Sequence, residues 1–538
     1  MENNRAIIAI ALIILLWSGY SMFFQPQQPP APVVEQQAAE QKNIAVEQTS
    51  PFTATNIEAV VEQKIDRSNY QEKLITVSSE LFEMTLSTTG ATIRGITLKQ
   101  FKESNDEDAK PFEYMVMSDL KNATFQTSGS EGLSIPTDMP FSLADGTPTS
   151  VSVDADKKVV SFTAQTSSGL TIVKSYIFHA DSYLVDVNVE LINSGSTSLK
   201  GYFNLSLVSL DPSAEGEGMQ NMYSFVGPLS FDGEELIEDK VEDLESSAKI
   251  YGENIVWSGN VSKYFLTIMA AGDSAKQIQI EKADTLIRNK FISPFISLDA
   301  GQKTVLDYTS FIGPKDYDLL QAAGHQFEFA KDYGFFAVLA KPLMHVLKFF
   351  YGYLGNYGLA IILLTICIKV IFWPLTQKSY KSMKGMQKLQ PEMQKMREKY
   401  GSDKQRLNQE MMTFYKENKV NPLGGCLPML IQIPVFFALY QVLLGAIELR
   451  HAPFMFWIAD LSAKDPYYIT PLIMGATMFI QQKMTPTNMD PNQAKIMLMM
   501  PVVFTFLFLN FPSGLVIYWM VNNLLTILQQ YLIKRQPD

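Results

Sequence analysis

One lysine lies inside an otherwise apolar stretch of the chain. Residues 359–373 read LAIILLTICIKVIFW, with Lys369 near their end. A charged side chain at membrane depth costs roughly 2.5 to more than 10 kcal/mol, so it normally faces water, a cavity or a partner. Thr365 precedes Lys369 by four residues and would share its face of a helix. The stretch therefore predicts a membrane-spanning helix whose positive charge needs a cavity or a partner.

A second interpretation is that Lys369 extends its stem to the membrane surface, since it lies near the end of its span. Other apolar stretches also contain polar residues: Gln432, Gln441, Gln481, Gln482, Asn522 and Asn523. These side chains could make ordinary hydrogen bonds between helices, worth about 0.6 kcal/mol per pair. Together with Thr365 and Lys369 they could also line one wet groove. Because no acidic residue lies deep in these stretches, Lys369 lacks an internal counter-ion, which favours the groove.

The charge of the chain is divided between two regions. Among the 538 residues, the segment 51–325 carries 21 Lys and Arg against 39 Asp and Glu, and the rest carries 23 against 16. An acidic soluble region is thus joined to a basic membrane region, which argues against nucleic acid as a partner of the large region. The two cysteines, Cys367 and Cys426, lie in or beside apolar stretches, and the four histidines are scattered. Neither a disulfide framework nor a metal site is expected, and no cofactor.

The N-terminal segment resembles a secretory signal. Arg5 precedes an apolar run within residues 1–24, and no small-residue cleavage motif follows it directly. We expect an uncleaved signal anchor with a cytoplasmic N-terminus, and a cleaved signal peptide is the alternative. Residues 25–50 are rich in Gln, Pro, Ala and Glu, which predicts a disordered linker.

Residues 51–325 have the period of β-strands. Val185, Val187 and Val189 alternate with polar residues, as do Phe82 and Met84. Many short strands without intervening helices predict an antiparallel β-sandwich. The carboxylates are dispersed and no catalytic motif occurs, so a structural or docking domain is expected; a sugar-binding groove or an enzyme is the alternative.

Two helical regions flank the span that contains Lys369. Residues 326–353 are aromatic but interrupted by lysines, which predicts an amphipathic helix at the membrane surface. Residues 354–375 form the second span. Residues 376–423 predict a helical hairpin, which is cytoplasmic because 376–420 carries eleven Lys and Arg against five Asp and Glu. Its methionines could hold the hairpin together or contact varied apolar partners: Met383, Met386, Met393 and Met396.

The C-terminal region predicts four further spans within residues 424–533. The tail, residues 534–538, begins with Lys534 and Arg535 and is therefore expected in the cytoplasm. With the N-terminal anchor, the chain would have six spans, five of them in the helical core, and both ends in the cytoplasm. The acidic domain would lie outside, so that every charge bias agrees with one topology in the lipid bilayer.

Two kinds of chemistry suit a basic group in such a groove. The charge could attract acidic residues of a passing polypeptide, while the groove lowers the cost of moving polar segments into lipid. Alternatively, burial could deprotonate Lys369 so that it activates the Thr365 hydroxyl, as in an intramembrane Ser/Thr–Lys hydrolase. A secondary transporter is disfavoured, because the sequence has no inverted repeat and no matched pair of broken spans.

Several longer motifs resemble the YidC-type membrane protein insertases. They are WPLT at 373–376, VNPLGGCLP at 420–428, LIQIP at 430–434, LSAKDPYY at 461–468 and FPSGL at 511–515. The resemblance covers the whole chain and is similar in layout to the Gram-negative form. It implies a non-enzymatic insertase and chaperone that places hydrophobic segments of new proteins into the bacterial inner membrane. The large domain would be a periplasmic super-sandwich, similar in fold to sugar mutarotases.

The resemblance also implies a set of groove residues and partners. The positive charge of the family's groove matches Lys369, although the family commonly has Arg there, so bidentate recognition of carboxylates is in doubt. The other groove positions implied are Thr365, Gln432, Tyr518, Trp519 and Asn522. The hairpin would admit clients and meet the ribosome or targeting factors. Nascent membrane proteins would be the clients, handled alone or with the SecYEG and SecDF translocon.

Overall fold

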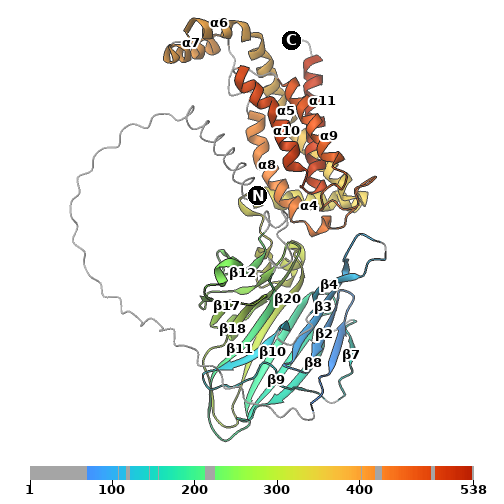
Figure 1. Ribbon diagram of the computed structural model, residues 1–538, viewed down its shortest axis with the longest axis vertical. Coiled ribbons are helices and arrows are strands. Elements are labelled where there is room, and N and C mark those ends of the chain that lie inside the picture. The colour runs from blue at the N-terminus through green and yellow to red at the C-terminus, as the bar shows by residue number, and fades with distance from the viewer. Residues whose placement is uncertain are drawn as a thin grey trace, which may run out of the picture. The chain divides into compact units, whose positions relative to one another are not determined.

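The computed structural model describes most of the chain after its first 69 residues (Figure 1). The described ranges are 70–106, 108–116, 122–144, 146–154, 157–211, 225–400, 403–418, 427–485 and 491–535. The predicted anchor at 1–24 and linker at 25–50 lie outside these ranges. So do the start of the predicted sandwich and, at 419–426, most of the VNPLGGCLP motif with Cys426.

The acidic region folds into a domain built mainly of β-sheet, as its alternating pattern predicts. The strands are β1 Leu74–Ser78, β2 Phe82–Ser87, β3 Thr92–Lys102, β4 Pro111–Val116, β5 Gln126–Ser130, β6 Ser142–Leu143, β7 Ser150–Ser152, β8 Lys158–Gln165, β9 Leu170–Phe178, β10 Leu184–Asn193, β11 Leu199–Leu210, β12 Gly227–Phe231, β13 Leu236–Glu238, β14 Lys249–Tyr251, β15 Trp257–Val261, β16 Phe265–Ala270, β17 Gln277–Ala283, β18 Leu286–Ile292, β19 Ile296–Leu298 and β20 Lys303–Pro314. Val185, Val187 and Val189 point into the core from β10.

The strands form three sheets. The largest has the order β13-β12-β15-β16-β20-β10-β9-β8-β6, and the others have the orders β4-β3-β2-β1-β7 and β14-β17-β18-β11-β19, with β5 on β11. The strand pairs in the described residues are antiparallel except β1 with β7. The prediction of a purely antiparallel sandwich therefore needs this one correction, since β7 returns beside β1 through a long connection instead of a tight turn.

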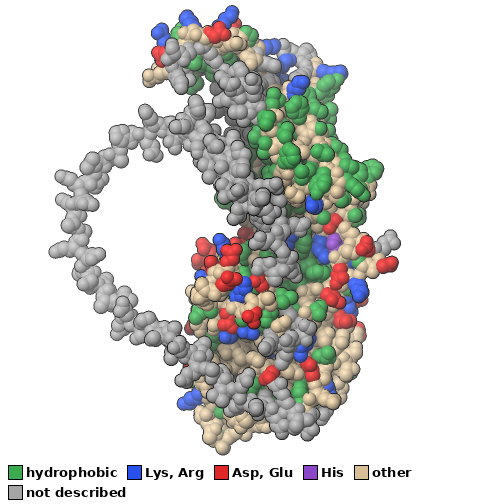
Figure 2. All heavy atoms as spheres, viewed as in Figure 1, with side chains coloured by type: hydrophobic (Ala, Val, Ile, Leu, Met, Phe, Trp, Pro, Cys, Tyr) green, Lys and Arg blue, Asp and Glu red, His purple; other side chains and the backbone are tan. Residues whose placement is uncertain are grey.

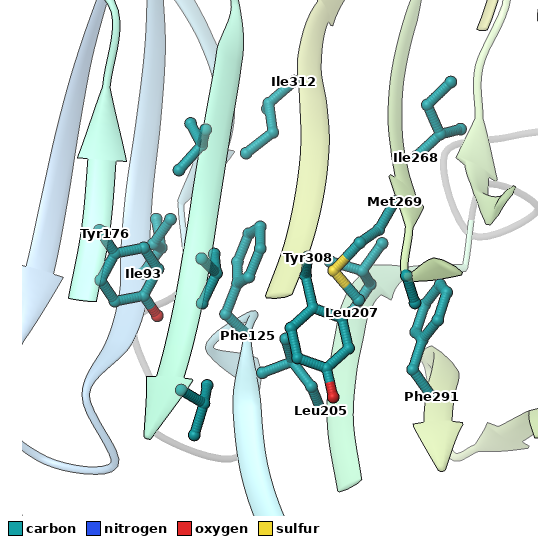
Figure 3. Close-up of a cluster of buried hydrophobic side chains, with 14 of the residues drawn as sticks. Ile93, Phe125, Tyr176, Leu205, Leu207, Ile268, Met269, Phe291, Tyr308 and Ile312 are labelled. Carbon is teal, nitrogen blue, oxygen red and sulfur yellow. The ribbon is translucent and has the colours of Figure 1, made fainter. Parts of the chain in front are cut away.

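Large apolar side chains from these sheets meet in one core (Figure 3). Phe125, Tyr176, Phe291 and Tyr308 are all less than 2% exposed. The fully buried Lys174 lies among them on β9. Apolar burial on this scale stabilises a fold by roughly 25 cal/mol per Å² removed from water, which explains how an acidic domain holds together.

Helices make up the rest of the described chain. They are α2 Val241–Leu244 and α3 Tyr317–Ala323 in the β-domain, then α4 Ala337–Leu354, α5 Tyr357–Lys388, α6 Gln390–Tyr400, α7 Lys404–Glu417, α8 Leu427–Leu444, α9 Ile469–Met484, α10 Pro491–Phe508 and α11 Ser513–Arg535. The short 3₁₀ helices are η4 Gly272–Ser274, η5 Phe327–Ala330, η6 Gly334–Phe336 and η8 Ile447–Leu449. The helix α11 lies against α5, α8 and α9.

The predicted second span continues as one helix, α5, into the beginning of the predicted hairpin, as far as Lys388. Pro374 lies inside it, where its missing N–H removes one helical hydrogen bond without ending the helix. The next helix, α6, begins at Gln390, and Pro391 lies in its first turn, where its missing N–H costs no helical hydrogen bond. Asp403 caps α7 by accepting a hydrogen bond from the Arg406 N–H at 3.0 Å.

The helices expose many apolar side chains. Val370, Ile371 and Phe506 are 63%, 70% and 69% exposed, and Figure 2 shows green side chains gathered over this bundle. Exposed apolar surface of this extent is costly in water and favourable in lipid. Two helices in the described residues, Gly334–Leu354 and Tyr357–Met386, have the length and composition to cross a membrane. The first includes α4, for which the sequence predicts a place at the membrane surface; that prediction remains untested.

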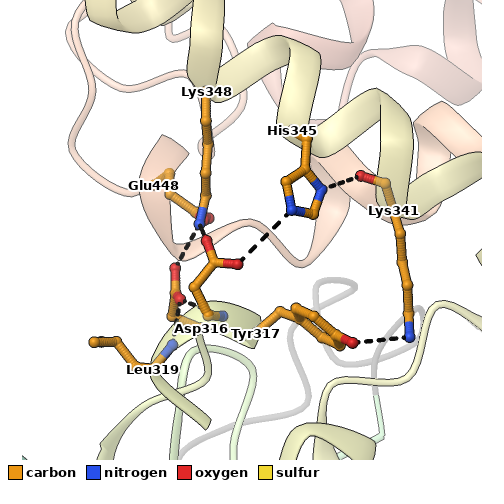
Figure 4. A network of polar contacts seen from close by, with 8 residues as sticks. Asp316, Tyr317, Leu319, Lys341, His345, Lys348 and Glu448 are labelled. Atoms are coloured by element: carbon orange, nitrogen blue, oxygen red, sulfur yellow. Dashed lines mark hydrogen bonds and ion pairs between the residues drawn. The ribbon is translucent and has the colours of Figure 1, made fainter. Parts of the chain in front are cut away.

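An ionic cluster joins α3, α4 and the turn after α8 (Figure 4). Lys348 of α4 lies 2.9 Å from Asp316, 2.6 Å from Asp318 and 3.0 Å from Glu448. Burial raises the pKa of Glu448. Burial would also raise the pKa of Asp316. The hydrogen bonds that Asp316 accepts from Lys348 and the Leu319 N–H outweigh this effect, so the pKa of Asp316 is lowered. One ammonium group thus links the last helix of the β-domain to the helical region.

Candidate functional site

A pocket opens between α5, α8 and α11. Its lining mixes apolar and polar side chains: Thr365, Ile368, Lys369, Phe372, Leu375, Thr376, Gln432, Val435, Tyr518 and Asn522. Since these residues come from three helices far apart in sequence, the pocket exists only in the folded bundle.

The helix α5 supplies the charge of the pocket. Lys369 is partly buried, and its Nζ donates a hydrogen bond to Thr526 Oγ1 of α11 at 2.8 Å. Among the residues that the structure describes, no carboxylate lies within ion-pair distance of this ammonium. Thr365 lies one turn earlier, and its hydroxyl donates to the Ile361 carbonyl at 2.6 Å. The pocket therefore holds a cation whose described partner is neutral.

The helices α8 and α11 form the opposite walls. Gln432 comes from the first half of α8, and its side chain hydrogen-bonds to the hydroxyl of Tyr518. Tyr518 and Asn522 come from α11 and lie four residues apart, so they share one helix face. Amide and hydroxyl groups thus stand across the space from Lys369.

The structure brings together five of the six predicted groove residues and leaves one aside. Thr365, Lys369, Gln432, Tyr518 and Asn522 all line the pocket. Trp519 does not, because the residue after Tyr518 is rotated by about 100° around the helix.

Trp519 lies instead in an aromatic cluster beside the pocket. Its ring centre lies 4.6 Å from that of Phe436, 5.2 Å from Phe508 and 6.1 Å from Phe504. Trp519 therefore supports the wall of the pocket from behind.

The hairpin methionines lie mostly inside the structure. Met383, Met386 and Met393 are buried, and Met396 is partly buried. This burial is what one expects if they hold the hairpin together. A role in contacting clients remains a prediction, and it requires the helices to separate.

Sequence reasoning missed three polar residues of α11: Thr526, Gln529 and Gln530. Thr526 accepts the bond from Lys369, and Gln529 Nε2 donates to Thr376 Oγ1 at 2.6 Å. Gln530 Nε2 donates to Thr485 Oγ1 at 2.9 Å. The available signal was the helical period, because 526 and 529 follow Asn522 by four and seven residues and so lie on its face.

The hydrolase alternative conflicts with this geometry. A general base must lie within hydrogen-bonding reach of the hydroxyl that it activates. The Thr365 hydroxyl donates to Ile361, and Lys369 donates to Thr526. The two side chains that would form the dyad are therefore each bonded elsewhere.

Comparison with known proteins assigns both regions of the chain. Residues 74–346 match the family described as the YidC periplasmic domain, and residues 349–538 match the 60Kd inner membrane protein family. The membrane protein insertase YidC of Geotalea uraniireducens is 42% identical over 100% of this chain and 100% of its own. That of Geobacter sulfurreducens is 45% identical over 99% of this chain and 98% of its own.

Two solved structures are also similar. One is an active YidC insertase with its first transmembrane domain resolved, 18% identical with a TM-score of 0.37 over 86% of this chain and 93% of that chain. The other is a galactose mutarotase-like protein from Lactobacillus casei, 12% identical with a TM-score of 0.31 over 44% of this chain and 99% of that chain.

Lipid-compatible helices around a polar pocket, joined to a large β-domain, define an integral membrane protein with an extramembrane domain. Its relatives are named as insertases and not as enzymes. The chain belongs to the YidC family of membrane protein insertases. It is a membrane protein insertase of the bacterial inner membrane, and its β-domain is periplasmic.

Proposed function

We propose that hydrophobic segments of new proteins enter the membrane along the pocket formed by Thr365, Lys369, Gln432, Tyr518 and Asn522. The observation that carries this proposal is their convergence from three helices around one open space. Lys369 supplies a positive charge that attracts acidic residues in the polar flank of a client. The surrounding hydroxyl and amide groups replace some of the water that the flank loses.

The energetics explain why such a pocket suffices without a nucleotide. Burying a client's apolar segment releases about 0.8 kcal/mol per CH₂, which drives insertion. The barrier is the transfer of the polar flank, since polar groups without partners cost several kcal/mol in hydrocarbon. A polar pocket part-way through the bilayer shortens that path. Acidic flanks gain most, because Lys369 has no described carboxylate partner to displace.

The proposed topology has six spans and cytoplasmic termini. The helices α5, α8, α9, α10 and α11 form the five-span core, and α4 lies at the periplasmic membrane surface. The basic hairpin of α6 and α7 faces the cytoplasm, in keeping with its excess of Lys and Arg. In this arrangement the hairpin meets the ribosome or targeting factors and opens to let clients reach the pocket. Cooperation with SecYEG and SecDF belongs to the same proposal.

The test replaces Lys369 in cells depleted of the endogenous insertase. We expect Lys369→Arg to restore insertion of a small client with an acidic flank, and Lys369→Ala to restore it several-fold less. Lys378→Ala is the matched control, because it makes the same change on α5 away from the pocket lining. Wild-type activity of Lys369→Ala with every client tested would overturn the proposal.

A further inference from the structure

Thr526 is the described hydrogen-bonding partner of the charge in the pocket. Its side chain is 4% exposed, on the side of α11 that faces α5. The Lys369 Nζ donates to its Oγ1 at 2.8 Å. Thr526 does not line the open space itself, so it contacts Lys369 from behind.

The chemistry of the two groups fixes the direction of this contact. A lysine ammonium has three donors and no acceptor, so the threonine oxygen must accept. The hydroxyl hydrogen is then free to donate elsewhere, and Thr526 Oγ1 lies 2.7 Å from the Asn522 carbonyl one turn earlier. Lys369, Thr526 and the Asn522 carbonyl form an ordered chain of hydrogen bonds from α5 into α11.

This series of hydrogen bonds fixes the position of the Lys369 ammonium. A lysine stem near the end of a span can extend along the helix to the membrane surface, where its charge is hydrated. The bond to Thr526 holds the stem across the gap between α5 and α11 instead. Of the three donors of Lys369, Thr526 takes one, and the others stay available to a group that enters the pocket.

We infer that Thr526 is a positioning residue for insertion, which keeps the Lys369 charge in the pocket by accepting its hydrogen bond. This inference rests on the proposed role of Lys369. Thr526→Val keeps the shape of the side chain and removes the acceptor, so Lys369 loses its anchor. Thr526→Ser keeps the hydroxyl and is expected to retain function.

The experiment is a double-mutant cycle with the full chain reconstituted in lipid vesicles. The measured quantity is the initial rate at which a single-span client with an acidic flank becomes protease-protected. We expect Thr526→Val to lower this rate by about three- to tenfold, the range that corresponds to one interhelical hydrogen bond. In the Lys369→Ala background the same change should cause no further fall.

Thr505→Val is the matched control. Its hydroxyl also bonds to a carbonyl one turn back, that of Pro501 at 2.7 Å, but it lies on α10 outside the pocket lining. This variant should insert the client at the wild-type rate. If Thr526→Val does not accumulate in membranes, Thr526→Ala removes the same acceptor and replaces it in the cycle.

The possible outcomes separate the two proposals. A wild-type rate for Lys369→Ala refutes the role of Lys369 itself. A slow Lys369→Ala with a wild-type rate for Thr526→Val refutes only the positioning role. An equal loss from Thr526→Val in both backgrounds, or a failure of Thr526→Ser, would show that Thr526 acts on packing alone and would overturn the inference.

Discussion

The buried Lys174 should make the stability of the β-domain depend on pH. Its Nζ donates to the Phe125 carbonyl at 2.5 Å and lies 5.2 Å from the centre of the Tyr176 ring. No carboxylate among the described residues pairs with it, and burial lowers the pKa of Lys174 well below its usual value. The unfolded chain, with an ordinary lysine pKa of about 10.4, therefore binds a proton more readily than the folded chain.

The sign and size of the effect follow from this difference. Between the folded pKa of Lys174 and about pH 10, the unfolded state binds more protons, so the free energy of unfolding rises with pH. The slope is at most about 1.4 kcal/mol per pH unit. Lys174→Met removes the titrating amine, so the pH dependence that it causes is lost. The substitution also leaves the Phe125 carbonyl without its donor, which costs about 1–3 kcal/mol of unfolding free energy at every pH.

Pulse proteolysis of the full chain in detergent, over a series of urea concentrations at pH 7, 8 and 9, measures the effect. We expect wild type to gain stability relative to Lys174→Met as the pH rises. Lys158→Met is the matched control, since Lys158 is exposed on the adjacent strand β8, and its difference from wild type should not vary with pH. A constant difference between wild type and Lys174→Met would refute the reasoning.

Three further substitutions test local interactions in the helical region and its junction. Lys348→Met leaves Asp316 and Glu448 without their shared cation, and we expect a loss of about 3 kcal/mol, seen as a lower unfolding temperature in detergent. Asp465→Asn weakens a buried carboxylate that accepts four hydrogen bonds before α9, with an expected loss of about 1.5–3 kcal/mol by the same measurement. Asp403→Ala removes the α7 cap, at about 1 kcal/mol, seen as faster hydrogen exchange in α7 while α11 is unchanged.

Each of these substitutions has a control or a contrary result. Lys303→Met breaks an ion pair with Glu190 in which the lysine is 66% exposed, so it should leave the unfolding temperature almost unchanged. If Lys348→Met lowered the unfolding temperature no more than Lys303→Met does, the ion pairs of Lys348 would contribute no more than an exposed surface pair. An unchanged unfolding temperature for Asp465→Asn, or unchanged exchange in α7 for Asp403→Ala, would contradict the roles given to those carboxylates.

The local features of the fold could be read from the sequence, and the pairing of strands could not. Alternation at Val185, Val187 and Val189 predicts which face of β10 is buried, because that period is local. The pairing of β11 with both β5 and β18 joins segments tens of residues apart, and no local pattern encodes it. The continuity of α5 through Pro374 likewise depends on packing, which outweighs the local preference of proline.

In the pocket, too, some residues could be predicted from local sequence and others only from the fold. Lys369 was predictable because a charge in an apolar span is costly, and the polar residues Gln432 and Asn522 were predictable for the same reason. Thr526 carries no charge that would mark it in an apolar helix, and its hydroxyl donates to the Asn522 carbonyl one turn earlier, as threonines in apolar helices commonly do. Its importance arises from a contact between α5 and α11 that only the fold creates. Trp519, which the family resemblance implied, lies beside the pocket and not in its lining, and its contact with clients stays a prediction.

Lys174, which is fully buried, and Lys369, which is partly buried, show why access, more than burial, separates structure from function. Lys174 and Lys369 each donate to a neutral oxygen, and neither has a carboxylate partner among the described residues. Lys174 is enclosed by the core, so its amine can only alter the stability of the β-domain. Lys369 lines an open pocket, so a ligand that enters it can supply a negative charge to pair with the ammonium. An acidic residue in a client's flank would then pair with Lys369, because no described carboxylate of the protein already pairs with that ammonium.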